Sequence, residues 1–241
     1  MARTGGFGRL GRIQVQIWLR HPGRPPARVG GVAYLEAVSI GRTRPTEHGV
    51  LKRTSIDKRP VAGPVRIGPL GLAGDEIADL KHHGGADQAV YAFAREDYVF
   101  WEAELGRSLA PGAFGENLTT VGLDVQGARI GERWLVGTCL LEVTDVRIPC
   151  SVFAGFVDVP NWVRRFTEHG VPGAYLRVIE PAEVSAGNPI AVAQTRPHDL
   201  TVGYAFRAAT SEPALLPGLA AEERLGRSRR RQVEKYLARL V

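Results

Sequence analysis

The chain lacks the features that mark secreted, membrane and disulfide-rich proteins. Its 241 residues include only two cysteines, Cys139 and Cys150, too few for a disulfide framework. It has no apolar run of about 18 residues, so no transmembrane helix and no membrane partner are expected. The first residues lack the apolar core and small-residue cleavage site of a secretory signal. We therefore expect a cytoplasmic protein in a reducing compartment.

The chain also lacks a distributed positive charge, although its formal net charge is +6. The excess lies in residues 1–31, which contain six arginines and no acid; the remainder holds 25 basic and 25 acidic residues. We expect no nucleic-acid partner, because no basic face is left outside this segment. Residues 1–31 are expected to be a basic extension, either disordered or preceding a true start near Val32. Lysine is scarce, with four against 27 arginines, which favours a bacterial source with a GC-rich genome.

Long helices are scarce too, and the hydrophobic pattern predicts an α+β protein that is mainly β. Short apolar runs bounded by Gly and Pro are typical of strands that turn sharply, as in a barrel. Strands are expected at residues 32–38, 61–72, 89–93, 133–146 with a turn at Gly137, 174–179 and 189–192. Helices are expected at residues 95–105, ending at Gly106, and at 160–169, ending at Gly170.

The character of the chain changes near residues 194–198. Residues 200–208, 212–219 and 222–240 read as short helices, the last of them basic. The sequence therefore predicts a β-rich main domain over 32–196 and a small helical tail over 197–241.

The most informative segment is residues 78–91. It combines two histidines, two carboxylates and two glycines just before an apolar run: His82, His83, Asp79, Asp87, Gly84 and Gly85. Glycine pairs let a backbone approach a ligand closely, because no Cβ intervenes. One histidine is expected to donate to an oxyanion or phosphate, and the aspartates to anchor the loop. A turn with solvated histidines is the alternative.

Two further segments carry candidate chemistry. In residues 111–118, Gly115 would allow close approach, and Asn117 offers a donor and an acceptor together. Cys150 follows Pro149 at an expected strand end, with Arg147 as a nearby cation, and thiolates are soft ligands for transition metals. We expect all three segments to meet at one pocket. Cys139 lies within a strand and is expected to be structural.

Other site types are less well supported by the spacing. Adjacent histidines on a strand point to opposite faces, and no HxH, HxxxH or CxxC pattern occurs, so a zinc site is weakly supported. A Cys–His hydrolase would pair Cys150 with His82, His83 or His169, but no flanking signature indicates it. A buried structural cysteine remains the alternative at Cys150.

Together these segments resemble the MOSC domain, the C-terminal domain of molybdenum cofactor sulfurases, and in particular its stand-alone YiiM-like bacterial branch. The likeness covers about residues 32–193, in the order and spacing of the family. The segments that carry it are residues 38–41, 52–61, 68–75, 82–91, 111–120, 130–133, 149–150, 173–178 and 184–188.

The resemblance implies a barrel-like β fold with flanking helices and a bound molybdenum cofactor, a molybdopterin that holds the metal. Cys150 matches the cysteine that ligates the metal. The positions expected around the cofactor and its phosphate are Lys58, Gly84, Gly85, Asp87, Phe114, Gly115, Asn117, Arg147 and Arg177. His82, His83 and Asn117 are the expected catalytic partners of Cys150.

Relatives of this family reduce N-hydroxylated bases and amidoximes, so the resemblance implies an oxidoreductase with such substrates and a separate electron-donating reductase. The chain departs from the family near the cysteine: Val146 and Ile148 replace a Pro and a Gln, which leaves the substrate range open. A carrier that transfers the cofactor or persulfide sulfur without redox turnover is the alternative, as is an enzyme of a dedicated biosynthetic pathway. The oligomeric state is left open.

Overall fold

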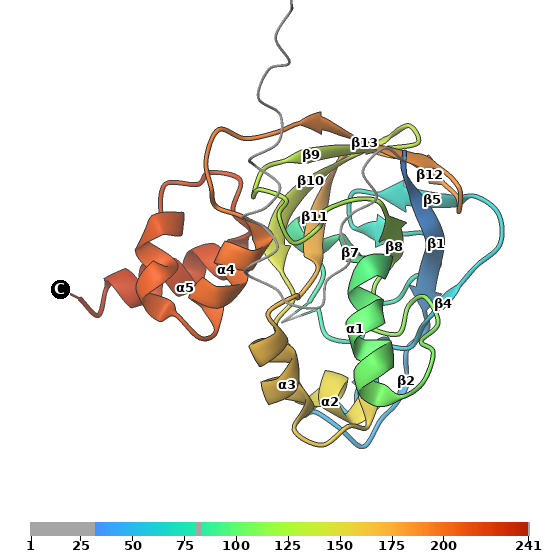
Figure 1. The fold of residues 1–241 in the computed structure, drawn as a ribbon, viewed down its shortest axis with the longest axis horizontal. Helices are drawn as coiled ribbons and strands as arrows, with labels where there is room; N and C mark the ends of the chain where they lie inside the picture. The colour runs from blue at the N-terminus through green and yellow to red at the C-terminus, as the bar shows by residue number, and fades with distance from the viewer. Residues whose placement is uncertain (1–31, 81–82, 241) are drawn as a thin grey trace, which may run out of the picture.

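The computed structural model describes residues 32–80 and 83–240, and a β-barrel forms its centre (Figure 1). The main sheet has the strand order β13-β9-β10-β11-β7-β8-β1-β4, and a further pairing of β13 with β1 closes seven of these strands into a barrel. Two smaller sheets, β12-β5-β6 and β2-β3, lie beside it. The strands are β1 (Ala33–Gly41), β2 (Arg44–Pro45), β3 (Arg53–Thr54), β4 (Lys58–Pro60), β5 (Val65–Gly68), β6 (Gly71–Leu72), β7 (Val90–Ala94), β8 (Leu118–Val121), β9 (Arg133–Val136), β10 (Cys139–Val146), β11 (Ala174–Glu180), β12 (Ala182–Val184) and β13 (Pro189–Gln194).

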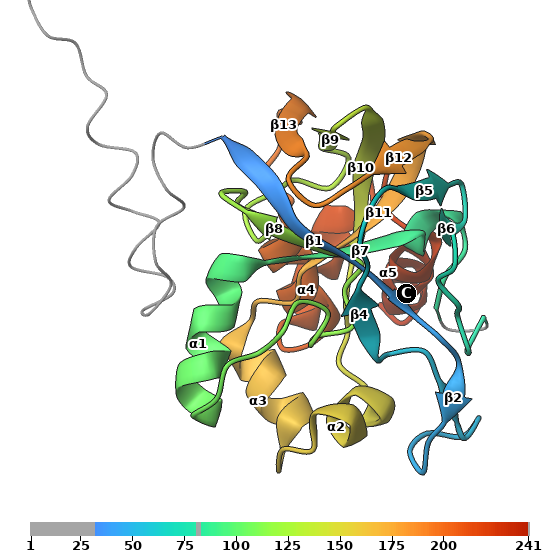
Figure 2. The same cartoon turned by 90° about the vertical axis from the view of Figure 1, so that its right-hand side faces the viewer.

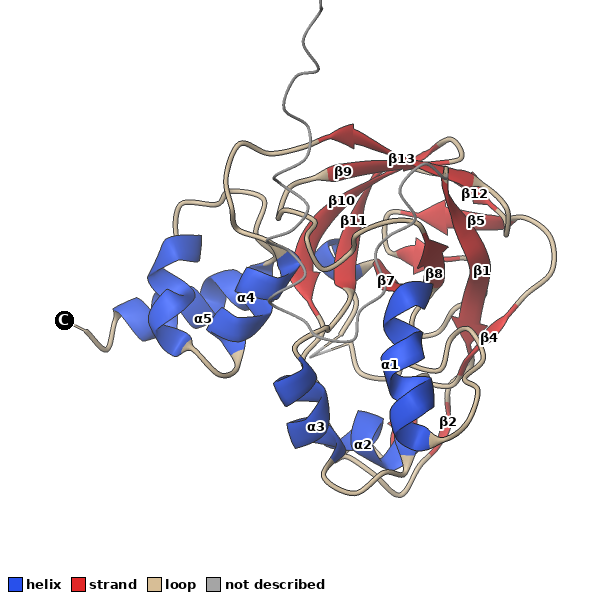
Figure 3. Cartoon of the chain, viewed as in Figure 1, coloured by secondary structure: helices blue, strands red, loops and turns tan. Residues whose placement is uncertain are grey.

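The helices lie in two groups outside the barrel. One group covers one end of it and the other lies beside it, as Figure 2 and the colours of Figure 3 show. The first group is α1 (Arg95–Leu105), α2 (Ser151–Val157) and α3 (Trp162–His169); the second is α4 (Val202–Ala209), η2 (Pro213–Leu219) and α5 (Arg227–Leu237). The short 3₁₀ helix η1 (Ala86–Gln88) precedes β7. None of the helices in the described part of the chain is long and apolar enough to cross a membrane.

The strand pairing explains the place of α1. Every pair in the main sheet is antiparallel except β7 and β8, which are parallel. Parallel neighbours need a crossover connection, and α1 with the following loop supplies it. The helix has the predicted bounds and ends at Gly106 in the left-handed conformation, with φ of 63°.

Most predicted elements are confirmed, and the α+β, mainly β prediction holds. The turn at Gly137 has a φ of 57°, and Gly170 caps α3 with a φ of 75°. The tail contains the three expected helical segments, but the second is a 3₁₀ helix that contains Pro213 and Pro217, and the third begins only at Arg227. The division into a domain over 32–196 and a tail over 197–241 stays a prediction, and residues 1–31 lie outside the described residues.

The largest local error concerns the segment after Cys150. The predicted strand end and loop are present, since β10 ends at Val146 and residues 147–150 are irregular, but the sequence did not predict α2, of which Cys150 is the N-cap. This helix contains Gly155 and ends at Asp158 in the left-handed region, so its own propensity is low. Tertiary packing holds it instead: Phe153 is buried in an aromatic cluster with Phe166 and Trp162, at ring distances of 5.2 and 5.4 Å.

Candidate functional site

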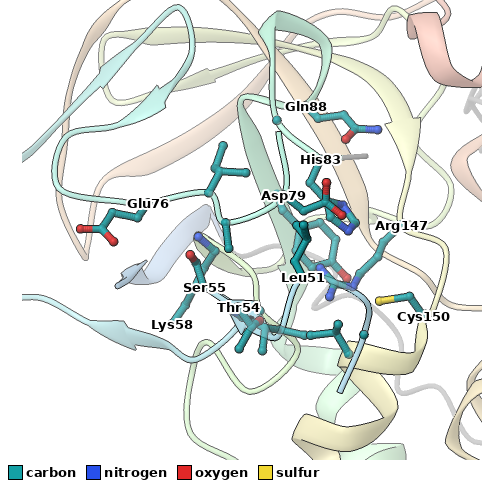
Figure 4. Close-up of a pocket in the computed structure, with 18 of the residues that line it drawn as sticks. Leu51, Thr54, Ser55, Lys58, Glu76, Asp79, His83, Gln88, Arg147 and Cys150 are labelled. Atoms are coloured by element: carbon teal, nitrogen blue, oxygen red, sulfur yellow. Dashed lines mark hydrogen bonds between the residues drawn. The ribbon is translucent and has the colours of Figure 1, made fainter. Parts of the chain in front are cut away.

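A cavity of about 700 Å³ lies where the three singled-out segments converge. Asp79, His83 and Gly84 come from the histidine loop, Gly115 and Asn117 from the loop before β8, and residues 147–152 from the end of β10 and the start of α2. Figure 4 shows Cys150, Arg147 and His83 around the same space. The prediction that these segments meet at one pocket is confirmed.

Cys150 and Arg147 form the wall nearest to α2. The thiol is partly buried, while the Arg147 side chain is almost wholly buried and carries an Nε atom with no hydrogen-bond partner in the described part of the chain. The guanidinium lies 4.6 Å from the ring centre of Phe153 and 5.1 Å from that of Tyr91. Burial acts to lower the pKa of Arg147, but Tyr175, Tyr91, Cys150 and Glu116 together outweigh it and raise the pKa. Arg147 is therefore a permanent cation beside the sulfur.

Lys58 and Asp75 form a second buried charged pair in the wall. The Lys58 ammonium lies 2.5 Å from the Asp75 carboxylate, and both side chains are nearly inaccessible. Burial lowers the pKa of Lys58 despite this partner, and Arg147 adds to the effect. Because Asp75 already neutralises it, Lys58 has less free charge for a bound anion than Arg147 has.

Asn117 borders the cavity, but its amide is engaged within the protein. Its Nδ2 donates to Asp75 Oδ2 at 2.9 Å and to the Ser39 carbonyl at 3.2 Å, while its Oδ1 accepts from the Tyr91 N–H at 3.2 Å. The side chain therefore joins β1, β7 and the loop that carries Asp75.

The glycines near the cavity make room chiefly for protein atoms. A Cβ at Gly84 would lie 2.6 Å from Ile77 Cδ1, and one at Gly115 would lie 2.9 Å from Ile56 Cγ1. Both residues have φ near 76°, so the backbone also requires glycine there. Gly85 has open space at its Cβ position but does not line the cavity.

Three further predicted cofactor contacts, besides Gly85, lie away from the cavity. Phe114 is buried and stacks on Phe93 at 4.5 Å. Arg177 binds Asp87 at 2.6 Å and Glu142 at 3.1 Å, and the other Asp87 oxygen accepts the Arg227 N–H of α5. This corrects the interpretation of these residues: Phe114 belongs to the core, and Arg177 and Asp87 connect the barrel to the tail.

The remaining predicted positions have mixed outcomes. His83 lines the cavity, whereas His82 lies outside the described residues. Cys139 is wholly buried, as expected, and burial raises its pKa. No group of three or more His, Cys, Asp and Glu side chains suited to a metal ion occurs among the described residues.

Sequence reasoning missed part of the cavity wall. Tyr91, Tyr175 and Asp75 line it, together with the hairpin tip around Val50 and Leu51. Asp75 follows a Gly-rich segment, which is a signal that could have identified it. The hairpin tip carries no motif, and only its position in the fold brings it to the cavity.

Comparison with known proteins identifies the family. The family model for the MOSC domain matches residues 79–191. The chain is 34% identical over 172 residues to the uncharacterised protein YflK of Bacillus subtilis, covering 71% of this chain and 78% of that protein. It is 35% identical over 166 residues to protein YiiM of Escherichia coli, and the match covers 67% of this chain and 73% of that protein. A Gibberella moniliformis protein named "Reductase" is 30% identical over 165 residues, but only 29% of its length is matched.

Solved structures agree with this relationship. YiiM from Geobacillus stearothermophilus superposes with a TM-score of 0.72 at 28% identity, covering 85% of this chain and 99% of that one. YiiM from Escherichia coli superposes with a TM-score of 0.68 at 27% identity, and the match covers 86% of this chain and 94% of that one. The fold, the order of the segments and these relatives agree, and the chain belongs to the MOSC domain family.

Proposed function

We propose that this protein is an oxidoreductase that binds the molybdenum cofactor and reduces N-hydroxylated compounds, namely N-hydroxylated bases and amidoximes. The observation that carries the proposal is the pairing of Cys150 with the buried cation Arg147 at a cavity of about 700 Å³. Membership of the MOSC family and one distant relative named as a reductase support the redox character.

The residues of the cavity fit this cofactor. Its volume lies within the range of small-molecule and cofactor sites, about 300–1,000 Å³. A thiol is the soft ligand that such a metal requires, and Cys150 is the cysteine that lines the cavity. Arg147 keeps a buried positive charge with an unsatisfied donor there, which suits an anionic group such as a dithiolene or phosphate.

Within such a complex Cys150 would ligate the metal, and Arg147 would balance the negative charge of the cofactor. The bound cofactor would supply the two electrons that break an N–O bond. Reduction of an N–OH group to N–H consumes two electrons and two protons and releases one water. His83 lines the cavity and is a candidate to pass a proton, while Asn117 and Asp75 hold the wall in place. The electrons would come from a separate reductase.

The test is metal and pterin analysis of protein expressed with ample molybdate, followed by an assay of benzamidoxime reduction with an electron donor. We expect about one molybdenum per chain in the wild type and in Cys139→Ala, since only Cys150 reaches the cavity. Cys150→Ala should lose both the metal and the reduction. Equal molybdenum in Cys150→Ala and the wild type would reject the ligand role.

A carrier function is the second candidate, because Cys150 is partly accessible and a thiol at a cavity can hold persulfide sulfur. Intact mass spectrometry would detect that sulfur on Cys150. A persulfide in the wild type, absent from Cys150→Ala, together with no turnover of benzamidoxime by metal-loaded protein, would favour the carrier.

A further inference from the structure

The hairpin formed by β2 and β3 stands at the mouth of the cavity, and its tip, residues 46–52, has a defined shape. The Thr46 N–H donates to the Lys52 carbonyl at 3.1 Å, and the Lys52 ammonium donates to the Glu47 carbonyl at 2.5 Å. Gly49 and Lys52 have φ of 72° and 50° in the left-handed region. These bonds close the tip on itself and define the path of its backbone.

The tip is seated on α2, the helix that begins directly after Cys150. A Cβ at Gly49 would lie 2.6 Å from Val152 Cγ2, and a Cβ at Gly155 would lie 2.0 Å from the His48 ring. Two glycines, one on each element, therefore allow this contact. The hairpin is held next to the thiol although it is distant from it in sequence.

Apolar side chains gather at this mouth. Val50 is 98% exposed, Leu51 51% and Ile148 37%, and Val152 adds a partly buried side chain. All four line the cavity, and Ile148 and Val152 lie two residues before and two after Cys150. A single exposed apolar side chain has no special meaning, but a cluster around one opening marks a contact surface. We call these four residues the apolar rim.

The deeper wall has the opposite character. Lys58, Asp75 and Asn117 satisfy one another there, and Arg147 stands beside the sulfur. A ligand that places its polar reacting group near Cys150 would leave its remaining part against the apolar rim. Burying an aryl ring against these side chains is favourable, whereas a sugar or a charged substituent would lose hydration there without a partner.

We propose that the apolar rim binds the aryl substituent of the substrate, so that the enzyme selects aryl amidoximes over amidoximes with a small substituent. This inference rests on the proposed function, whose site it deepens. Leu51 and Ile148 are the specificity-determining residues.

The experiment uses benzamidoxime and acetamidoxime, which share one reacting group and differ only in phenyl against methyl. Binding of each is measured by calorimetry to metal-loaded protein without an electron donor, so no turnover occurs. The ratio of the two values of kcat/KM is then measured with a donor. The variants are Leu51→Ser and Ile148→Gln, with Leu135→Ser as the control, because Leu135 is 38% exposed on β9 and does not line the cavity.

The wild type and Leu135→Ser should prefer benzamidoxime in binding and in kcat/KM. Each rim variant should reduce that preference about ten-fold, the scale expected for an apolar pocket contact, and keep its molybdenum. An unchanged preference in both rim variants would overturn the proposal and leave the proposed function intact. Selective binding of benzamidoxime that depends on the rim, without any reduction, would overturn the proposed function and leave the rim's role standing.

A second copy of the chain is the other possible occupant of the exposed tip, and sedimentation velocity distinguishes it from a substrate. If Val50 and Leu51 instead joined two copies of the chain, Leu51→Ser would have a different sedimentation coefficient from the wild type. Its binding of benzamidoxime would be the same as that of the wild type. That result would also overturn the proposal.

Discussion

Two groups of buried charge lie near the end of β10. The charges of one group are paired with each other, whereas the other keeps an unsatisfied donor. On the tail side, Arg229 of α5 binds Asp145 at 3.1 Å, and Arg133 and Arg177 bind Glu142 at 2.9 and 3.1 Å. On the cavity side, two residues beyond Asp145, Arg147 is as deeply buried but has aromatic rings as neighbours and an unsatisfied Nε. We call the first group the tail interface and Arg147 the cavity cation.

The difference indicates which buried charges serve the fold and which serve a ligand. Taking a charge out of water is costly, and proteins usually offset that cost with a partner. The tail interface provides its partners within the chain. The Nε atom of the cavity cation has no such partner among the described residues, and under the proposed function a bound anion would supply it. Replacing one arginine by methionine in each group tests this comparison, because the loss of stability should be large at the tail interface and small at the cavity cation.

The largest effect on stability is expected from Arg229→Met. The change leaves the wholly buried Asp145 carboxylate without its cation, and breaking a buried pair costs about 3–5 kcal/mol. The free energy of unfolding from urea titration should fall by this amount. The double variant Arg229→Met with Asp145→Asn should recover most of it, because no lone charge remains. An unaltered stability in the single variant would show that the tail interface is not held by this pair.

The cavity cation should respond differently to the same substitution. Arg147→Met removes the cost of burying a charge with an unsatisfied donor. This stabilising effect offsets the loss of the arginine's contacts with Tyr91 and Phe153. We expect the free energy of unfolding to change by less than about 1 kcal/mol. Molybdenum content should nevertheless fall about ten-fold or more. A large loss of stability with full metal content would assign Arg147 to the fold and remove the contrast.

The smallest effect on stability is expected at Lys58. Burial lowers the pKa of this residue, whereas its ion-pair partner Asp75 raises it. Burial lowers its pKa below the ordinary 10.5, so at alkaline pH the unfolded chain binds a proton that the folded chain has released. The contribution of Lys58 to the free energy of unfolding therefore rises with pH between the lowered pKa and 10.5.

The measurement compares the wild type with Lys58→Met by urea titration from neutral to alkaline pH. The difference between the two free energies of unfolding should change in favour of the wild type as pH rises. Lys235→Met, at an exposed position of α5, is the control and should show no such trend. A difference that falls with pH would mean that Asp75 outweighs burial.

Much of the fold follows from local patterns. The helix over Arg95–Leu105 has its spacing of apolar residues and its terminal glycine in one continuous segment, and the turn at Gly137 joins two strands rich in Val and Leu. In contrast, α2 has weak propensity and forms because Phe153 packs against α3 and because His48 packs against Gly155. Such a helix is not visible in its own sequence.

The candidate site divides in the same way. Cys150, Arg147, His83 and Lys58 were recognisable because reactive and charged side chains are unusual beside Gly- and Pro-rich turns. The roles of Asp87 and Arg177 were not recognisable, because a charged residue looks the same whether its partner is a ligand or another side chain. Only the folded arrangement pairs them with each other and with α5.

The sequence alone determined that this is a barrel-like α+β protein of the MOSC family with a cysteine at its candidate site, since periodicity, turns and motif order are local properties. The tertiary structure decided which charges remain unpaired, which glycines make room for protein atoms, and that Val50 and Leu51 reach the mouth of the cavity. These properties depend on contacts between segments far apart in the chain, and no local pattern records them.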